Sequence, residues 1–95
     1  MNIVNKVKIG GIVYNVEQPS LIDNNPDVDG QIDYKNQLIA LKSDMDIHSD
    51  YAKQVFLHEI LHGIYEHCGF EQDEEKIRTL SIALYTVIAD NPNIF

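Results

Sequence analysis

The first half of the chain alternates apolar and polar positions with the period of two that is typical of β-strands. One pair of strand-like segments flanks Gly10-Gly11, a dipeptide that accepts the positive φ angles of a tight hairpin turn. A second pair flanks Lys35-Asn36, and the turn formers of residues 19–30 separate the two pairs as one irregular loop. The expected strands cover residues 7–9, 12–16, 31–34 and 37–41. We therefore expect a small antiparallel β-sheet.

The second half of the chain changes to a period of about 3.6, which predicts helices. Ser49 can accept a hydrogen bond from the free amides of a helix start, and Gly69 can take the left-handed conformation that ends a helix, with Phe70 packing beside it. The apolar positions between these two residues are Val55, Phe56, Leu57, Ile60, Leu61, Ile64 and Cys68. They cover most of the helix surface, so we expect a largely buried helix.

A second helix is expected to begin near Asp73, Glu74 and Glu75, whose negative charges suit the positive end of a helix dipole. It stops at Asp90-Asn91-Pro92. Its expected apolar stripe consists of Ile77, Leu80, Leu84, Val87 and Ile88. The fold class that follows is α+β, a small antiparallel sheet followed by two helices.

Composition narrows the class of protein. A chain of 95 residues is too short to divide into two cores, and 44% hydrophobic residues suffice for one modest core, so residues 1–95 are expected to form a single domain. The formal net charge of -8 disfavours binding to nucleic acid or to a membrane surface. The single cysteine, Cys68, excludes an intramolecular disulfide and a thiolate zinc cluster. No segment reads as a signal peptide or a membrane span, so we expect a cytoplasmic protein.

The polar positions of the first expected helix carry the candidate chemistry. They are the two histidines and the glutamate of the sequence H-E-I-L-H at residues 58–62. The pattern H-E-x-x-H is expected by chance in about 1% of shuffled chains of this composition. His58 and His62 lie one above the other on a helix and can chelate a single zinc ion. Glu59 lies beside that ion, where its carboxylate can deprotonate a water whose pKa the zinc lowers toward about 7.

A catalytic zinc ion needs a third protein ligand. A third histidine six residues after His62 is absent, because that position is Cys68. The acidic run at residues 71–75 is the remaining source, and Glu74 is the best candidate because it shares the face of the second helix that packs on the first. Glu71, Asp73 and Glu75 remain alternatives, of which Glu75 points to the opposite side.

HEILHGI, followed by EEKIRTLSIALYTVIADNP, resembles the short phage-borne zinc metallopeptidases of the ImmA/IrrE type, which are compact members of the gluzincin group. The resemblance is strongest over residues 55–92. It implies a zincin-like fold with zinc on His58, His62 and Glu74, and with Glu59 as the general base and proton shuttle. It also implies a peptide or protein substrate, for which a regulatory protein such as a repressor is one candidate.

Other readings remain open. Residues 25–36 match part of a calcium-binding loop, but asparagines occupy its two anchoring ends, so we expect an ordinary loop that leads into a strand. His67 is expected to be an ordinary polar residue. A role for His48 in binding substrate or metal stays open. His48 or one of the tyrosines could also stabilise an oxyanion. The alternative to an enzyme is a non-catalytic, metal-binding protein that serves as an interaction module.

Overall fold

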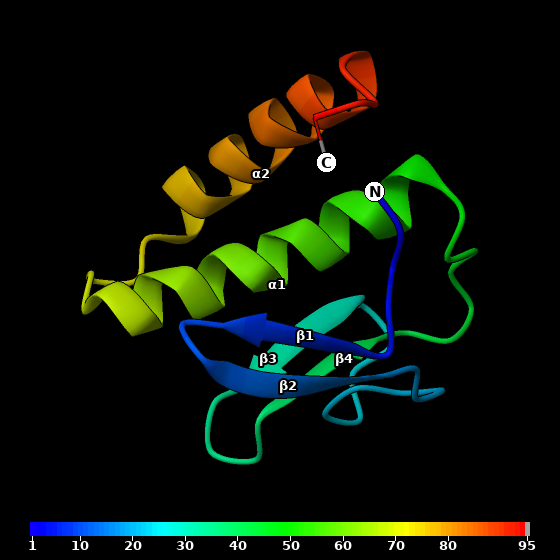
Figure 1. Cartoon of the computed structure of the whole chain (residues 1–95). Helices are drawn as coiled ribbons and strands as arrows, with labels where there is room; N and C mark the ends of the chain where they lie inside the picture. Colours follow the sequence, from blue (N-terminus) through cyan, green and yellow to red (C-terminus); the bar gives the residue numbers. More distant parts are fainter. Residues whose placement is uncertain (95) are drawn as a thin grey trace.

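The computed structural model describes residues 1–94, as four strands followed by two helices (Figure 1). The strands are β1 (Lys6–Ile9), β2 (Ile12–Glu17), β3 (Gly30–Asp33) and β4 (Leu38–Leu41). The helices are α1 (Asp50–Cys68) and α2 (Glu74–Asp90). The α+β fold expected from the change of period along the chain is confirmed.

The four strands form one sheet in the order β1-β2-β4-β3. The two expected hairpins, β1–β2 and β3–β4, are antiparallel. The central pair differs from the expectation of a wholly antiparallel sheet, because β2 and β4 are parallel, with Val16 opposite Ile39. Residues 18–29 carry the chain to the far edge of the sheet before β3 begins, so that β4 returns into the middle. The strand β3 is therefore an edge strand.

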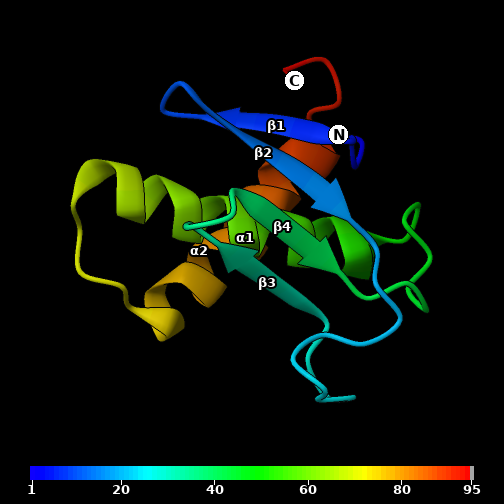
Figure 2. The ribbon, with the colours of Figure 1, turned by 90° about the horizontal axis from the view of Figure 1, so that it is seen from below.

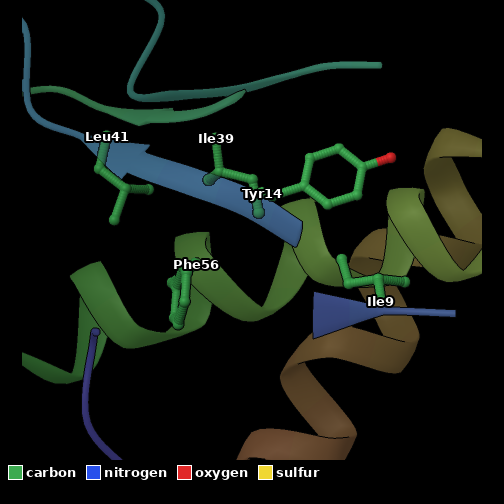
Figure 3. Close-up of a cluster of buried hydrophobic side chains, with 5 residues drawn as sticks. All are labelled: Ile9, Tyr14, Ile39, Leu41 and Phe56. Atoms are coloured by element: carbon green, nitrogen blue, oxygen red, sulfur yellow. The ribbon is translucent and has the colours of Figure 1, made fainter. Parts of the chain in front are cut away.

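Helix α1 lies across one face of the sheet (Figures 1 and 2). Its apolar side chains pack against those of the strands. The buried cluster between these two layers contains Ile9, Tyr14, Ile39, Leu41 and Phe56 (Figure 3). Phe56 comes from α1 and the other four come from β1, β2 and β4. This packing fixes the orientation of α1 about its own axis, and therefore the direction of its polar side chains.

The ends of α1 are those that the sequence predicts. The Ser49 side chain accepts a hydrogen bond of 3.1 Å from the amide of Ala52 at the start of the helix. Gly69 takes the left-handed conformation with φ of 71°, and the amide of Phe70 donates to the carbonyl of Tyr65 over 2.9 Å. The Phe70 ring packs edge-on against Tyr65.

Helix α2 lies on the side of α1 that faces away from the sheet (Figure 1). Its buried positions are Ile77, Ser81, Tyr85 and Ile88. The expected stripe was therefore wrong at Leu80 and Val87, which are 47% and 46% exposed. The buried face of α2 contains Tyr85 in their place, and the Tyr85 hydroxyl donates a hydrogen bond of 2.6 Å to the Asp50 carboxylate at the start of α1.

The expectation that α1 is largely buried also needs correction at its C-terminal end. Ile64 is 38% exposed, and residues 66–68 are exposed as well. The physical reason is that α2 begins beside the middle of α1, so the last turns of α1 extend beyond the second helix.

Candidate metal centre

Two imidazole rings on α1 point at the same place. The Nε2 atoms of His58 and His62 lie 3.2 Å apart, and both rings are half-buried. Two ligands bonded to one zinc ion at about 2.0–2.1 Å in tetrahedral geometry lie about 3.3 Å from each other. The separation of the two nitrogens therefore fits a shared ion.

Glu74, in the first turn of α2, faces both rings. Its Oε1 lies 2.7 Å from Nε2 of His58, and its Oε2 lies 2.7 Å from Nε2 of His62. Within residues 1–94 these three side chains are the only group of histidine, cysteine or acidic residues whose ligand atoms gather closely enough to hold a metal ion. Their predicted proximity is confirmed. Glu75 lies with Lys76 and Leu80 on another part of the surface, as the helical geometry predicts.

The short connection between the helices explains how Glu74 reaches the histidines. From His62 to the end of α1 the helix rises by about 9 Å, whereas five extended residues can span up to about 17 Å. Residues 69–73, which form an irregular linker, are therefore long enough to run back beside α1 (Figure 1). The side chain of Asp73 then accepts a hydrogen bond from the amide of Lys76 over 3.1 Å and starts α2 at Glu74.

Glu59 is the buried acid of the site, with 7% of its surface exposed. Burial raises the pKa of its carboxyl from the ordinary 4.5 to about 7, while nearby His62 acts in the opposite direction. A Cβ atom added at Gly30 would lie 2.6 Å from Cγ1 of Val55 and 3.2 Å from Oε2 of Glu59. Only glycine therefore lets the edge strand β3 pass this close to the carboxylate.

Gln72 is a residue of the site that sequence reasoning missed, and Tyr34, which also lies there, is one of the tyrosines whose role the sequence left open. The Oε1 atom of Gln72 lies 2.7 Å from Nδ1 of His62, and its Nε2 donates to the His62 carbonyl over 3.1 Å and to the Tyr34 hydroxyl over 3.2 Å. Burial raises the pKa of Tyr34 to about 12, so its hydroxyl keeps its proton. Only the nearness of Gln72 to Glu74 in the sequence could have suggested its place.

Two adjoining clefts give access to these residues. The larger has a volume of about 370 Å³ and runs between α2 and the start of β3, with Arg78 and Asp29 among its charged lining residues. Tyr51 stands in its wall and donates a hydrogen bond to the carboxylate of Asp29. The smaller, of about 300 Å³, lies along the edge strand at Gln31 and Ile32. His58, Glu59 and Glu74 line both clefts.

Burial favours the neutral form of the His58 imidazole, which is the form that can bind a metal ion. Burial lowers the pKa of His58, and the neighbouring Glu74 carboxylate opposes that effect. A neutral imidazole with its Nε2 directed at a carboxylate and a second imidazole is a typical arrangement of nitrogen and oxygen ligands for zinc.

The remaining candidate residues lie elsewhere. His67 packs over the β1–β2 turn, where its ring is the nearest neighbour of Gly10. His48 is exposed, and its amide donates to the Asp46 carboxylate over 2.9 Å in the loop before α1. In the calcium-like segment, Asp33 accepts two hydrogen bonds from Asn36 and closes the turn before β4. Within residues 1–94 none of these side chains belongs to a group that could hold a metal ion.

Comparison of the chain with protein-family models, with curated proteins and with solved structures gives no match. Across residues 1–94, neither helix combines the length and apolar character needed to cross a lipid bilayer.

Proposed function

We propose that the protein is a zinc-dependent peptidase whose metal ion is held by His58, His62 and Glu74. One observation carries the proposal: two imidazole nitrogens and a carboxylate from a separate helix converge in a cleft that the buried side chain of Glu59 also lines. A bound zinc ion would supply Lewis acidity, which lowers the pKa of water and polarises a carbonyl group.

Glu59 is the proton carrier in this proposal. A group with a pKa of about 7 is present in both its ionised and its protonated form near neutral pH. Its carboxylate takes a proton from the attacking water as the water oxygen bonds to the peptide carbonyl carbon. The same carboxyl then gives that proton to the nitrogen as the C–N bond breaks, which leaves a carboxylic acid and an amine.

The edge strand β3 supports a peptide rather than a small molecule as the substrate. Within residues 1–94 no strand pairs with its outer edge, and Gln31 and Ile32 line the cleft that also contains His58 and Glu59. An extended peptide can hydrogen-bond along such an edge as an added strand. This would hold one peptide bond beside Glu59. The proposed function is the activity implied by the resemblance to zinc metallopeptidases of the ImmA/IrrE type.

Metal content and hydrolysis, measured on the same preparations, test the proposal. The protein is purified without chelator, zinc per chain is measured by plasma mass spectrometry, and a diverse peptide library is incubated with the wild type and with Glu59→Gln. We expect about one zinc ion per chain in both proteins and cleavage by the wild type alone. Zinc without cleavage by either protein would favour the non-catalytic, metal-binding alternative.

The ligand assignment has its own matched pair of variants. Glu74→Ala should lose zinc, because it removes the oxygen atoms that lie 2.7 Å from the two imidazoles. Glu75→Ala removes the same charge from the neighbouring position and should keep zinc. Equal zinc content in the two variants would show that Glu74 is not a ligand.

A further inference from the structure

The side chain of Gln72 makes three contacts with a single neighbourhood, although it belongs to a linker without regular secondary structure. Its Nε2 donates to the main-chain carbonyl of His62 over 3.1 Å and to the Tyr34 hydroxyl over 3.2 Å. Its Oε1 lies 2.7 Å from Nδ1 of His62. Both ends of one carboxamide are therefore engaged.

These contacts determine where the proton of the His62 ring lies. A main-chain carbonyl can only accept a hydrogen bond, so the Gln72 atom that faces it must be the NH2 group. The other end is then the amide oxygen, which can only accept, so Nδ1 of His62 must be the donor. Nε2, the atom that faces Glu74 and His58, is then the ring nitrogen left to bind a metal ion in place of a proton.

The same contacts hold the linker in place. Among the described residues, the backbone groups of Glu71 and Gln72 make no hydrogen bond of the loop or turn type. The carboxamide of Gln72 is thus what ties this part of the linker to α1, two residues before Glu74. Tyr34, which directly follows β3, extends the connection to the sheet.

We propose that Gln72 is a positioning residue of the metal site, fixing the His62 tautomer that presents an Nε2 lone pair and holding the linker so that Glu74 completes the ligand set. This inference rests on the proposed function, because it deepens the same site. Outer hydrogen bonds of this kind typically change metal affinity by about 10–100-fold.

Gln72→Met and Gln72→Glu test the role of the hydrogen bonds, with Glu71→Met as the matched control in the same linker. Methionine keeps the length of the side chain but cannot make the contacts, whereas glutamate keeps an acceptor for Nδ1–H. Competition with a chromophoric chelator should show zinc affinity about 10–100-fold weaker in Gln72→Met. Gln72→Glu should fall between the wild type and Gln72→Met, since it keeps a charge-assisted acceptor for Nδ1–H but loses both donors. Glu71→Met should stay within about threefold of the wild type.

A second measurement, on the metal-free protein, separates this inference from the proposed function. Long-range ¹H–¹⁵N NMR spectra of the imidazoles should show a proton on Nδ1 of His62 in the wild type and in Glu71→Met, but none on that atom in Gln72→Met. A wild-type His62 with no proton on Nδ1, or equal zinc affinity of Gln72→Met and Glu71→Met, would overturn the role of Gln72. A wild type that binds no zinc would overturn the metal site itself, and with it the positioning role.

Discussion

The buried carboxyl of Glu59 should make the metal-free protein less stable as the pH rises. Its pKa is about 7 in the folded protein and 4.5 as its ordinary value, which the unfolded chain approximates. Between these two pH values the folded state binds more protons than the unfolded state, so the free energy of unfolding falls as pH increases. Below 4.5 the carboxyl is protonated in both states, and above 7 the loss is complete.

The magnitude follows from the gap between the two pKa values. At about 1.4 kcal/mol for each pH unit, the interval from 4.5 to about 7 corresponds to a loss of about 3 kcal/mol. Glutamine resembles the protonated carboxyl in shape and cannot ionise. We therefore expect Glu59→Gln to be about 3 kcal/mol more stable than the wild type at pH 8. The two proteins should be nearly equal at pH 4.

Urea unfolding of the metal-free proteins from pH 4 to 8, with chelator present, measures this difference. Circular dichroism is a suitable probe, because the chain has no tryptophan. Titrating groups away from Glu59 contribute equally to both proteins, so most of the difference between them comes from Glu59. Glu75→Gln, at an exposed position, is the control for replacing one carboxylate by an amide. A stability difference between the wild type and Glu59→Gln that stays constant across the range would refute the reasoning.

Four further substitutions test the packing of the fold and the wall of the cleft. Gly30→Ala should lower the free energy of unfolding by about 1–3 kcal/mol, because the new methyl group would lie 2.6 Å from Cγ1 of Val55. Val55→Ala in the same chain should restore part of that loss. If the losses of the two single variants in urea unfolding add up to that of the double variant to within about 0.5 kcal/mol, the clash is contradicted. Gly63→Ala should also destabilise the protein. The new methyl group would lie 2.7 Å from Cδ1 of Ile9, and we expect this close contact to outweigh a gain in helix propensity of about 1 kcal/mol. A higher midpoint of urea unfolding would show that Ile9 moves to make room. Arg78→Gln should leave zinc content unchanged but lower peptide cleavage by at least about tenfold, because it removes a positive charge from the cleft wall where negative charge develops on the substrate. Equal cleavage rates would rule out that role.

Local signals in the sequence were enough to predict the ends of α1. Ser49 and Gly69 act through hydrogen bonds to residues at most four positions away, so their effect does not depend on the rest of the fold. The proximity of His58 and His62 is equally local, because it follows from the helix repeat. The side of α2 that carries Glu74 was predicted for the same reason.

Long-range features could not be predicted in this way. The parallel pairing of β2 with β4 depends on the path of residues 18–29, which no periodicity encodes. The buried face of α2 was ambiguous because apolar residues occur on several of its sides, and Tyr85 rather than Leu80 faces α1. The approach of Glu74 to the histidines depends on the path of the linker, whose Gln72 side chain contacts His62 ten positions earlier in the chain.

Among the described elements, α2 packs against α1 alone and has no comparable contact with any strand. A cation shared by His58, His62 and Glu74 would therefore link α2 to α1, the helix that also packs on the sheet. Removal of the metal should then accelerate amide hydrogen exchange more in α2 than in the other elements. Binding of the metal should restore the protection of α2, while the exchange of the β4 amides should change little.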